Sequence, residues 1–209
     1  MSAVLREPES LAPGIVLMPD RATREGFEAA LTVIEAAPPR HFRTPNGGRM
    51  SVRCTNCGQL GWIADRLGYR YAGADPETGL AWPAMPAILR DLAVEAAEAA
   101  GFRAFSPDAC LVNLYDAEAR MGLHQDRNEN DFSQPVVSIS YGMSGRFRMG
   151  GTRRGDPSRT LLLHHGDILV FGGPARLMYH GVDRLDGPPD PILGRARLNL
   201  TFRRVTAGR

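Results

Sequence analysis

The chain has 209 residues, a formal net charge of +2 and 43% hydrophobic residues, a composition typical of a folded protein with one sizeable core. No run approaches the roughly 20 apolar residues of a membrane-spanning helix, and the N-terminal stretch lacks the apolar centre of a secretion signal. We therefore expect a cytoplasmic protein without a membrane partner. The three cysteines are an odd number, which does not favour a disulfide framework.

The basic residues are all arginines, because the 25 Lys and Arg positions include no lysine. A biased genomic base composition is one explanation. Arginine also offers planar, forked donors that suit carboxylates and phosphates. The arginines cluster in residues 40–53, 146–159 and 195–204. The low net charge therefore leaves room for a local basic groove that binds nucleic acid.

The first predicted elements are a strand at 14–18 and a helix at 21–36, with Asp20 as its capping residue. Spacing by three and four residues predicts that this helix faces the core with Phe27, Leu31 and Ile34.

Residues 40–83 are rich in Gly, Pro and Arg and lack helical periodicity. We predict a substrate-binding lid there, with short strands at 49–54, 61–62 and 69–71. Residues 84–100 form the clearest helix, which begins near Pro86 and stops at Gly101. Its expected core-facing residues are Ile88, Leu89, Leu92 and Ala96.

From about residue 108 the pattern changes to short β-rich segments separated by turn residues, which is typical of a sandwich, barrel or jelly roll. The predicted strands are 110–115, 135–141, 146–149, 159–164, 167–171, 177–182 and 197–203. We expect a mainly β fold in one compact unit. Residues 1–107 would form an N-terminal α/β lobe, and residues 108–209 would form the core.

The most informative short motif is His124-Gln125-Asp126. On an extended backbone, residues two apart point the same way, so the imidazole and the carboxylate can reach one cation. A distal histidine would complete the two-His-one-carboxylate set of non-heme Fe(II) oxygenases. His180 is the leading candidate, and His164 and His165 compete with it. The alternative is that the motif is an exposed loop without metal.

Cys54 and Cys57 have the spacing of half a zinc site, but no second pair closes four ligands, so structural zinc is not favoured.

The last predicted strand alternates completely between polar and apolar residues. The polar face would be solvent-exposed in an ordinary half-buried strand, or it would line a cavity that binds a dicarboxylate. Its members are Arg197, Asn199, Thr201 and Arg203. Asn113 and Tyr115 form a smaller polar face on an earlier strand.

Three segments together resemble the AlkB family of Fe(II)- and 2-oxoglutarate-dependent dioxygenases, which reverse alkylation damage on nucleic acid bases. They are LVNLYDAEARMGLHQD (111–126), FGGPARLMYHG (171–181) and RARLNLTFRR (195–204), and the likeness continues upstream in TPNGGRMSVRCTNCGQLGW (44–62) and YRY (69–71). The resemblance implies a double-stranded β-helix (jelly-roll) core. It also implies three cofactors or cosubstrates: Fe(II), 2-oxoglutarate and O2.

The resemblance further implies which residues form the site. His124, Asp126 and His180 would bind iron. The expected 2-oxoglutarate residues are Asn113, Tyr115, Arg197, Asn199 and Arg203. Which of the two arginines binds which carboxylate stays open.

On the substrate side, Trp62 resembles the family's base-stacking aromatic residue, with the His124 ring as the opposing surface. The residues expected near the nucleotide backbone are Thr44, Tyr69, Arg70 and Tyr71, and Arg154 is expected near the base. Met121, Cys54 and Phe171 are further candidates for the pocket wall. Asn128 departs from the acidic residue of the family pattern, and Gly47-Gly48 replaces an aromatic residue; Arg127 replaces a lysine and keeps the charge.

The implied activity is oxidative demethylation of N-alkylated bases such as 1-methyladenine and 3-methylcytosine in DNA, preferably single-stranded, with release of formaldehyde, succinate and CO2. We expect a monomer. The alternatives are the same chemistry on RNA or on a substrate other than nucleic acid, and a jelly roll that binds nucleic acid without catalysis.

Overall fold

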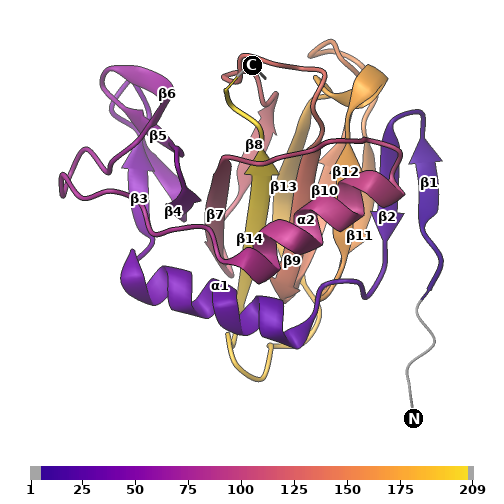
Figure 1. Cartoon of the computed structure of the whole chain (residues 1–209), viewed down its shortest axis with the longest axis horizontal. Coiled ribbons are helices and arrows are strands. Elements are labelled where there is room, and N and C mark those ends of the chain that lie inside the picture. The colour runs from indigo at the N-terminus through magenta and orange to yellow at the C-terminus, as the bar shows by residue number, and fades with distance from the viewer. Residues whose placement is uncertain (1–5, 207–209) are drawn as a thin grey trace.

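The computed structural model describes residues 6–206, and antiparallel β-sheet makes up most of its regular structure (Figure 1). An eight-stranded sheet has the order β1-β2-β12-β9-β14-β7-β4-β3, a four-stranded sheet has the order β11-β10-β13-β8, and β5 and β6 form a hairpin. The strands are β1 (Glu9–Ala12), β2 (Ile15–Met18), β3 (Arg40–Arg43), β4 (Arg49–Gly58), β5 (Gly61–Asp65), β6 (Gly68–Ala72), β7 (Ala109–Asp116), β8 (Met121–His124), β9 (Val136–Gly142), β10 (Ser144–Met149), β11 (Arg159–Leu163), β12 (Ile168–Phe171), β13 (His180–Asp186) and β14 (Ala196–Arg203).

The two helices, α1 (Arg24–Ala36) and α2 (Ala87–Ala99), lie across one face of the large sheet (Figure 1). One apolar cluster joins Phe27 and Leu89 of the helices to the large sheet, and a second cluster fills the space between the two sheets. The expectation of a mainly β fold with a jelly-roll core is confirmed. Within residues 6–206, neither helix has the length and apolarity that crossing a membrane requires.

The start of α1 differs from the prediction. Thr23, and not Asp20, is the capping residue, because its hydroxyl accepts a hydrogen bond from the Gly26 N–H at 3.1 Å. Phe27 is buried as predicted, whereas Leu31 and Ile34 are only partly buried.

In α2, Pro86 precedes the first turn as expected, and Gly101 adopts a φ of +88° just after the helix ends. Leu89 and Ala96 are buried, but Ile88 is exposed, so its predicted place in the core is wrong. Ile88 is adjacent to Leu89 in sequence and therefore projects about 100° away from it around the helix.

Every predicted strand has a counterpart, but the three strands β1, β3 and β8 were not predicted. The strand predicted from residue 177 begins only at His180, because a 3₁₀ turn over Gly173–Ala175 precedes it. Strands from both sides of the expected boundary at residues 107 and 108 share the large sheet. That division therefore stays a prediction about two segments of one compact unit.

The position of β14 matters most for the site. It lies between β9 and β7, and its register with β7 pairs Arg197 with Tyr115 and Asn199 with Asn113. Its polar side chains are buried between the two sheets. The face that could have been solvent-exposed therefore lines the interior.

Candidate active site

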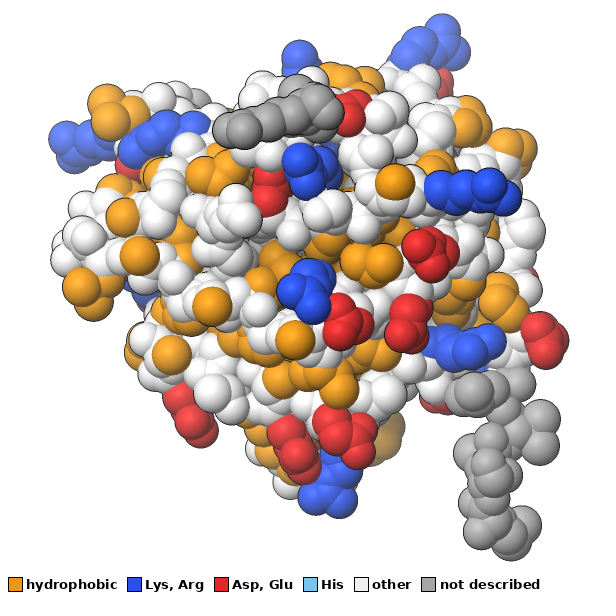
Figure 2. Space-filling view, in the orientation of Figure 1, with side chains coloured by type: hydrophobic (Ala, Val, Ile, Leu, Met, Phe, Trp, Pro, Cys, Tyr) orange, Lys and Arg blue, Asp and Glu red, His pale blue; other side chains and the backbone are white. Residues whose placement is uncertain are grey.

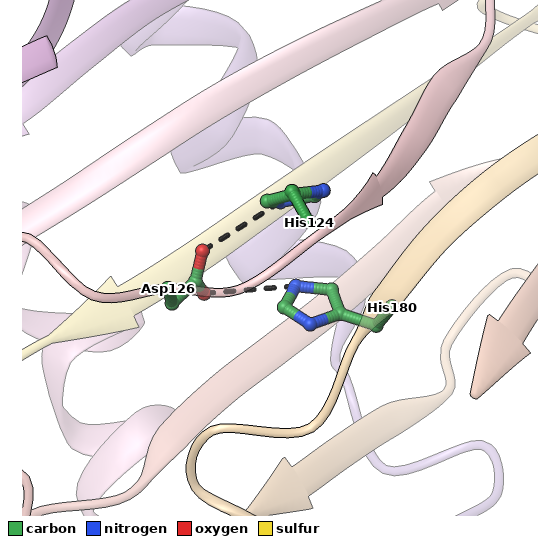
Figure 3. Close-up of side chains that lie close together, drawn as sticks. All are labelled: His124, Asp126 and His180. Atoms are coloured by element: carbon green, nitrogen blue, oxygen red, sulfur yellow. Dashed lines mark ion pairs between the residues drawn. The ribbon is translucent and has the colours of Figure 1, made fainter. Parts of the chain in front are cut away.

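Three potential metal ligands converge between the sheets (Figure 3). His124 ends β8, Asp126 follows it, and His180 begins β13 opposite His124 in the strand register. The His124 Nε2 atom lies 3.6 Å from Asp126 Oδ1, and His180 Nε2 lies 3.7 Å from Asp126 Oδ2. One ligand atom from each residue lies within 4.8 Å of the others. This donor set, two imidazoles and one carboxylate, fits Fe(II).

Backbone carbonyls orient both rings. His124 Nδ1 lies 2.9 Å from the Gly122 oxygen, and His180 Nδ1 lies 3.1 Å from the Met178 oxygen. A carbonyl can only accept, so each Nδ1 donates and each Nε2 keeps its lone pair for a metal. Burial lowers the pKa of His180 to about 4, with a further contribution from His124. His180 is therefore neutral at pH 7.

The competing histidines lie elsewhere. His164 Nδ1 is 2.9 Å from the Ser144 hydroxyl, and His165 Nδ1 accepts the Gly142 N–H at 3.0 Å. Among residues 6–206, the triad is the one group of His, Cys, Asp and Glu side chains with metal-binding geometry. The three cysteines are buried and free, and Cys54 donates to the Asn113 side-chain oxygen at 3.4 Å. Burial raises the pKa of Cys54 to about 12, so its thiol stays protonated.

A buried arginine orients the metal-facing carboxylate. The Arg203 Nη2 and Nε atoms donate to Asp126 Oδ2 at 2.7 and 3.0 Å. Burial alone would raise the pKa of Asp126, but the Arg203 guanidinium, which also donates hydrogen bonds to this carboxylate, outweighs it and holds that pKa well below its usual range. Asp126 is therefore ionised and ready to bind a cation at neutral pH.

Behind Arg203 lies a residue that sequence reasoning missed. The Glu129 side chain is almost fully buried, with Arg176 Nη2 at 3.0 Å, Arg203 Nε at 3.6 Å and the Tyr71 hydroxyl donating at 2.5 Å. No motif spacing singles out Glu129, and only its burial reveals the role. It links the β5–β6 hairpin, through Tyr71 and Arg203, to Asp126.

A narrow cavity of about 450 Å³ continues inward from the triad. The five residues expected to bind 2-oxoglutarate line it: Asn113, Tyr115, Arg197, Asn199 and Arg203. Met121 and Phe171 also line it, whereas Cys54 does not.

Arg197, one of these five residues, is 1% exposed. Its Nη2 donates to the Ser140 hydroxyl at 2.9 Å, and its guanidinium carbon lies 5.4 Å from the centre of the Tyr115 ring. The Nε and Nη1 atoms are buried without a hydrogen-bond partner. Burial lowers the pKa of Arg197. A carboxylate at the Nη1 edge would supply an acceptor that the guanidinium lacks, so the cavity fits a dicarboxylate.

Asn199 organises its neighbours. Its side-chain nitrogen donates to the Ser138 hydroxyl at 2.8 Å and to the Ile139 carbonyl at 3.0 Å, and its oxygen accepts from Thr201 at 3.2 Å. Gly145 leaves the space that Arg197 occupies, because a Cβ atom there would lie 2.8 Å from Arg197 Nε. The sequence pattern did not indicate a role for Ser138, Ser140 or Gly145.

A wider cleft of about 1480 Å³ opens next to the triad and shares His124 and Arg203 with the inner cavity. The predicted substrate residues that line it are Thr44, Trp62, Tyr69, Asn128 and Arg154. Arg70 and Tyr71 are not among its lining residues: Arg70 forms a two-contact ion pair with Asp65 at 2.7 and 2.8 Å, and Tyr71 is bonded to Glu129.

Trp62 has a fixed orientation in this cleft. It stacks on Tyr69 with ring centres 5.7 Å apart and an interplanar angle of 13°. Its indole N–H donates to the Asn128 side-chain oxygen at 3.1 Å. The Asn56 side chain donates to the Trp62 carbonyl at 3.0 Å and accepts the Trp62 N–H at 2.9 Å. The cleft therefore presents a held aromatic plane to a flat ligand.

Comparison with known proteins adds independent findings. The family model described as "2OG-Fe(II) oxygenase superfamily" matches residues 11–203. The chain is 46% identical over 204 residues to "Alpha-ketoglutarate-dependent dioxygenase AlkB" of Salmonella typhimurium, covering 94% of this chain and 93% of that protein.

Two further relatives are more distant. The chain is 35% identical over 133 residues to "Nucleic acid dioxygenase ALKBH1" of Mus musculus, covering 63% of this chain and 34% of that protein. The solved structure of OsALKBH1 superposes with a TM-score of 0.77 at 29% identity, covering 95% of this chain and all of that one.

Proposed function

This chain belongs to the 2OG-Fe(II) oxygenase superfamily and to its AlkB dioxygenases, and from that premise we propose that it repairs N-alkylated bases in DNA by oxidative demethylation. One observation carries the proposal: three metal-binding side chains, His124, Asp126 and His180, converge beside a cavity. That cavity contains the buried Arg197, which lacks hydrogen-bond partners for two of its nitrogen atoms. When bound, Fe(II) couples decarboxylation of 2-oxoglutarate by O2 to hydroxylation of an alkyl carbon, so that succinate, CO2 and formaldehyde leave and the base is restored.

The chain's own residues bind and orient the reactants. The two Nε2 atoms and the Asp126 carboxylate form one face of the metal site, and Arg203 keeps that carboxylate ionised. Arg197 receives the far carboxylate of 2-oxoglutarate, with Asn113 and Tyr115 beside it. The contact between Arg203 and one end of 2-oxoglutarate is part of the same proposal. No protein side chain has to remove a proton in this assignment.

The proposed substrate is a base turned out of its stack into the wide cleft. Trp62 provides one planar wall and His124 the other, and a base stacked on an aromatic side chain gains about 1–3 kcal/mol. Thr44 and Tyr69 would lie near the nucleotide backbone and Arg154 near the base. Arg70 and Tyr71 would act through the hairpin that they stabilise.

We further propose 1-methyladenine and 3-methylcytosine in single-stranded DNA as the first substrates, acted on by a cytoplasmic monomer. Single strands suit the cleft because an unpaired base costs least to turn out. The name of the ALKBH1 relative, a nucleic acid dioxygenase, supports nucleic acid as the substrate class. Asn128 offers the base a neutral amide, so the preferred lesion must be measured.

The decisive test measures formaldehyde and succinate released from oligonucleotides that carry each lesion, as single-stranded DNA, duplex DNA and RNA. We expect turnover that depends on 2-oxoglutarate and Fe(II), and its loss in His124→Ala, Asp126→Ala and His180→Ala. His164→Ala is the matched control and keeps activity, because His164 lies outside the triad. Faster turnover on RNA would replace the DNA assignment. Undetectable turnover together with absent iron would favour a jelly roll that binds nucleic acid without catalysis.

A further inference from the structure

A second groove, of about 1330 Å³, lies on β3 and β4 next to the wide cleft, and its lining is basic. Its five basic residues are Arg40, His41, Arg43, Arg49 and Arg53. The same two strands contribute Met50, Ser51 and Val52 to the wide cleft, and Thr44 follows β3 directly. One β-ribbon therefore borders both hollows.

The charges in this groove are not balanced. Its acidic residues are already paired: Asp65 with Arg70 at 2.7 Å, and Glu77 with Arg40 at 2.5 Å. Arg53 pairs with Asp116 at 2.7 Å. Among residues 6–206, no carboxylate forms an ion pair with Arg43 or Arg49.

The strand register makes these two arginines stand out. Arg43 and Arg49 are direct cross-strand partners, and both are exposed. Like charges placed directly opposite each other destabilise a sheet. Charged residues on an edge strand can prevent edge-to-edge association, which would explain Arg43 in β3. Protection of an edge strand does not explain Arg49, because β4 lies between β3 and β7 and has no free edge.

We infer that Arg43 and Arg49 bind the phosphodiester backbone of the substrate nucleic acid, a few nucleotides away from the base in the cleft. This inference rests on the proposed function for the base site. Two exposed guanidiniums without carboxylate partners match the charge and forked geometry that phosphates accept. By contrast, basic and acidic side chains are interspersed on the helix face of the molecule (Figure 2).

The test compares a lesion-containing trinucleotide, which fills only the cleft, with a fifteen-nucleotide strand that carries the same lesion. In Arg43→Ala/Arg49→Ala, we expect Kd for the long strand to rise about tenfold, and the slope of log K against log salt to fall by about 1.4, from two lost contacts at about 0.7 each. Turnover of the trinucleotide stays unchanged. An unmodified long strand loses affinity equally, because backbone contacts are independent of the lesion.

Two further variants separate charge from structure. Arg43→Lys/Arg49→Lys keeps the charges and should retain most of the long-strand affinity. Arg24→Ala/Arg90→Ala removes two exposed arginines from α1 and α2 and should leave Kd nearly unchanged. Removing the opposed charges relieves repulsion, so the melting temperature of Arg43→Ala/Arg49→Ala should be no lower than that of the parent.

Failure of the inference and failure of the proposed function are distinguishable. Long-strand affinity unchanged in Arg43→Ala/Arg49→Ala, or weakened no more than in Arg24→Ala/Arg90→Ala, overturns the backbone site even if every oligonucleotide is demethylated. Loss of long-strand affinity in the lysine variant as large as in the alanine variant also overturns it. If long-strand binding responds as expected but no oligonucleotide is demethylated, the backbone site stands and the repair activity does not.

Discussion

At the scale of single residues, Arg197 is the clearest sign of a missing ligand. It is buried and lacks hydrogen-bond partners for two of its nitrogen atoms. A buried cation in that state costs free energy, because it has lost water without gaining a full set of partners. The glycine at position 145 and the hydroxyl of Ser140 shape the space around it. The Arg197 guanidinium is therefore a preformed binding group for a carboxylate.

Arg197→Met should have opposite effects on binding and on stability. KM for 2-oxoglutarate should rise about 100-fold or more, because each charge-assisted hydrogen bond contributes about 1.5–3 kcal/mol. The ligand-free protein should unfold at a higher temperature, because an unpaired buried charge has been removed. Arg184→Met, which changes an exposed arginine of β13, is the control and should alter neither value. An unchanged KM in Arg197→Met would remove Arg197 from the cosubstrate site.

The sequence predicted which residues of β14 are polar but could not decide whether they face water or a cavity. The alternation of Arg197, Asn199 and Arg203 is the same in both cases. The answer depends on whether a second sheet covers that face, and this is decided by strands that are distant in sequence. Arg203 shows the same limit, because its partner Asp126 is 77 residues away. The alternation leaves both readings of the polar face open, and the resemblance to a family favours the cavity.

At the scale of elements, the β5–β6 hairpin is a separate two-stranded sheet that joins the core through buried Ile63 and Ala64 and through several polar contacts. Asn56 of β4 forms two hydrogen bonds with the backbone of Trp62, and Tyr71 of β6 bonds to Glu129. A two-stranded hairpin is marginally stable alone. These contacts therefore determine where Trp62 and Tyr69 lie relative to the metal site.

Asn56→Ala should loosen this hairpin. The free energy of unfolding should fall by about 1–3 kcal/mol, because the Trp62 N–H and carbonyl lose their partners. Oligonucleotide affinity should fall as well, since the stacking plane is no longer held. Urea unfolding and oligonucleotide titration measure the two effects, with Thr32→Ala, an exposed position of α1, as the control. Oligonucleotide binding as tight as that of the parent would show that Asn56 does not position Trp62.

Local patterns predicted the elements that have a clear apolar run or period and missed three strands that have neither. Helix α2 and the strands of the core have clear periodicity and turn residues, and they form where expected. The unpredicted strands β1, β3 and β8 each have four residues. The equally short β2 and β12 were predicted because each is a continuous apolar run, IVLM and ILVF, which the three missed strands lack.

At the scale of the whole molecule, the metal site brings together strands that are distant in the sequence. β8 and β13 bring two histidines together, and β14 supplies the arginine that holds Asp126. The motif analysis ranks His180 ahead of His164 and His165, and the family resemblance then singles it out. The histidine pairing depends on the register between β8 and β13, which sequence reasoning did not predict.

A divalent metal should therefore stabilise the entire fold. Mn(II) at 100 times its Kd should add about 2.7 kcal/mol to the free energy of unfolding, because it binds the folded state alone. A chelator should reverse the rise in melting temperature. Asp126→Ala should abolish the metal-induced rise, and Asp183→Ala, on an exposed side chain of β13, should retain it. An equal rise in both variants would place the metal elsewhere.

The position of β14 between β9 and β7 has a consequence for how the protein is made. β14 follows every other strand in the chain, so the ribosome produces β7 and β9 before the strand that separates them. Until then, two buried strands lack a hydrogen-bonding partner along one side, and such exposed edges promote aggregation. Completion of the large sheet and assembly of the arginine-bearing cavity are consequently the same late event in the life of each molecule.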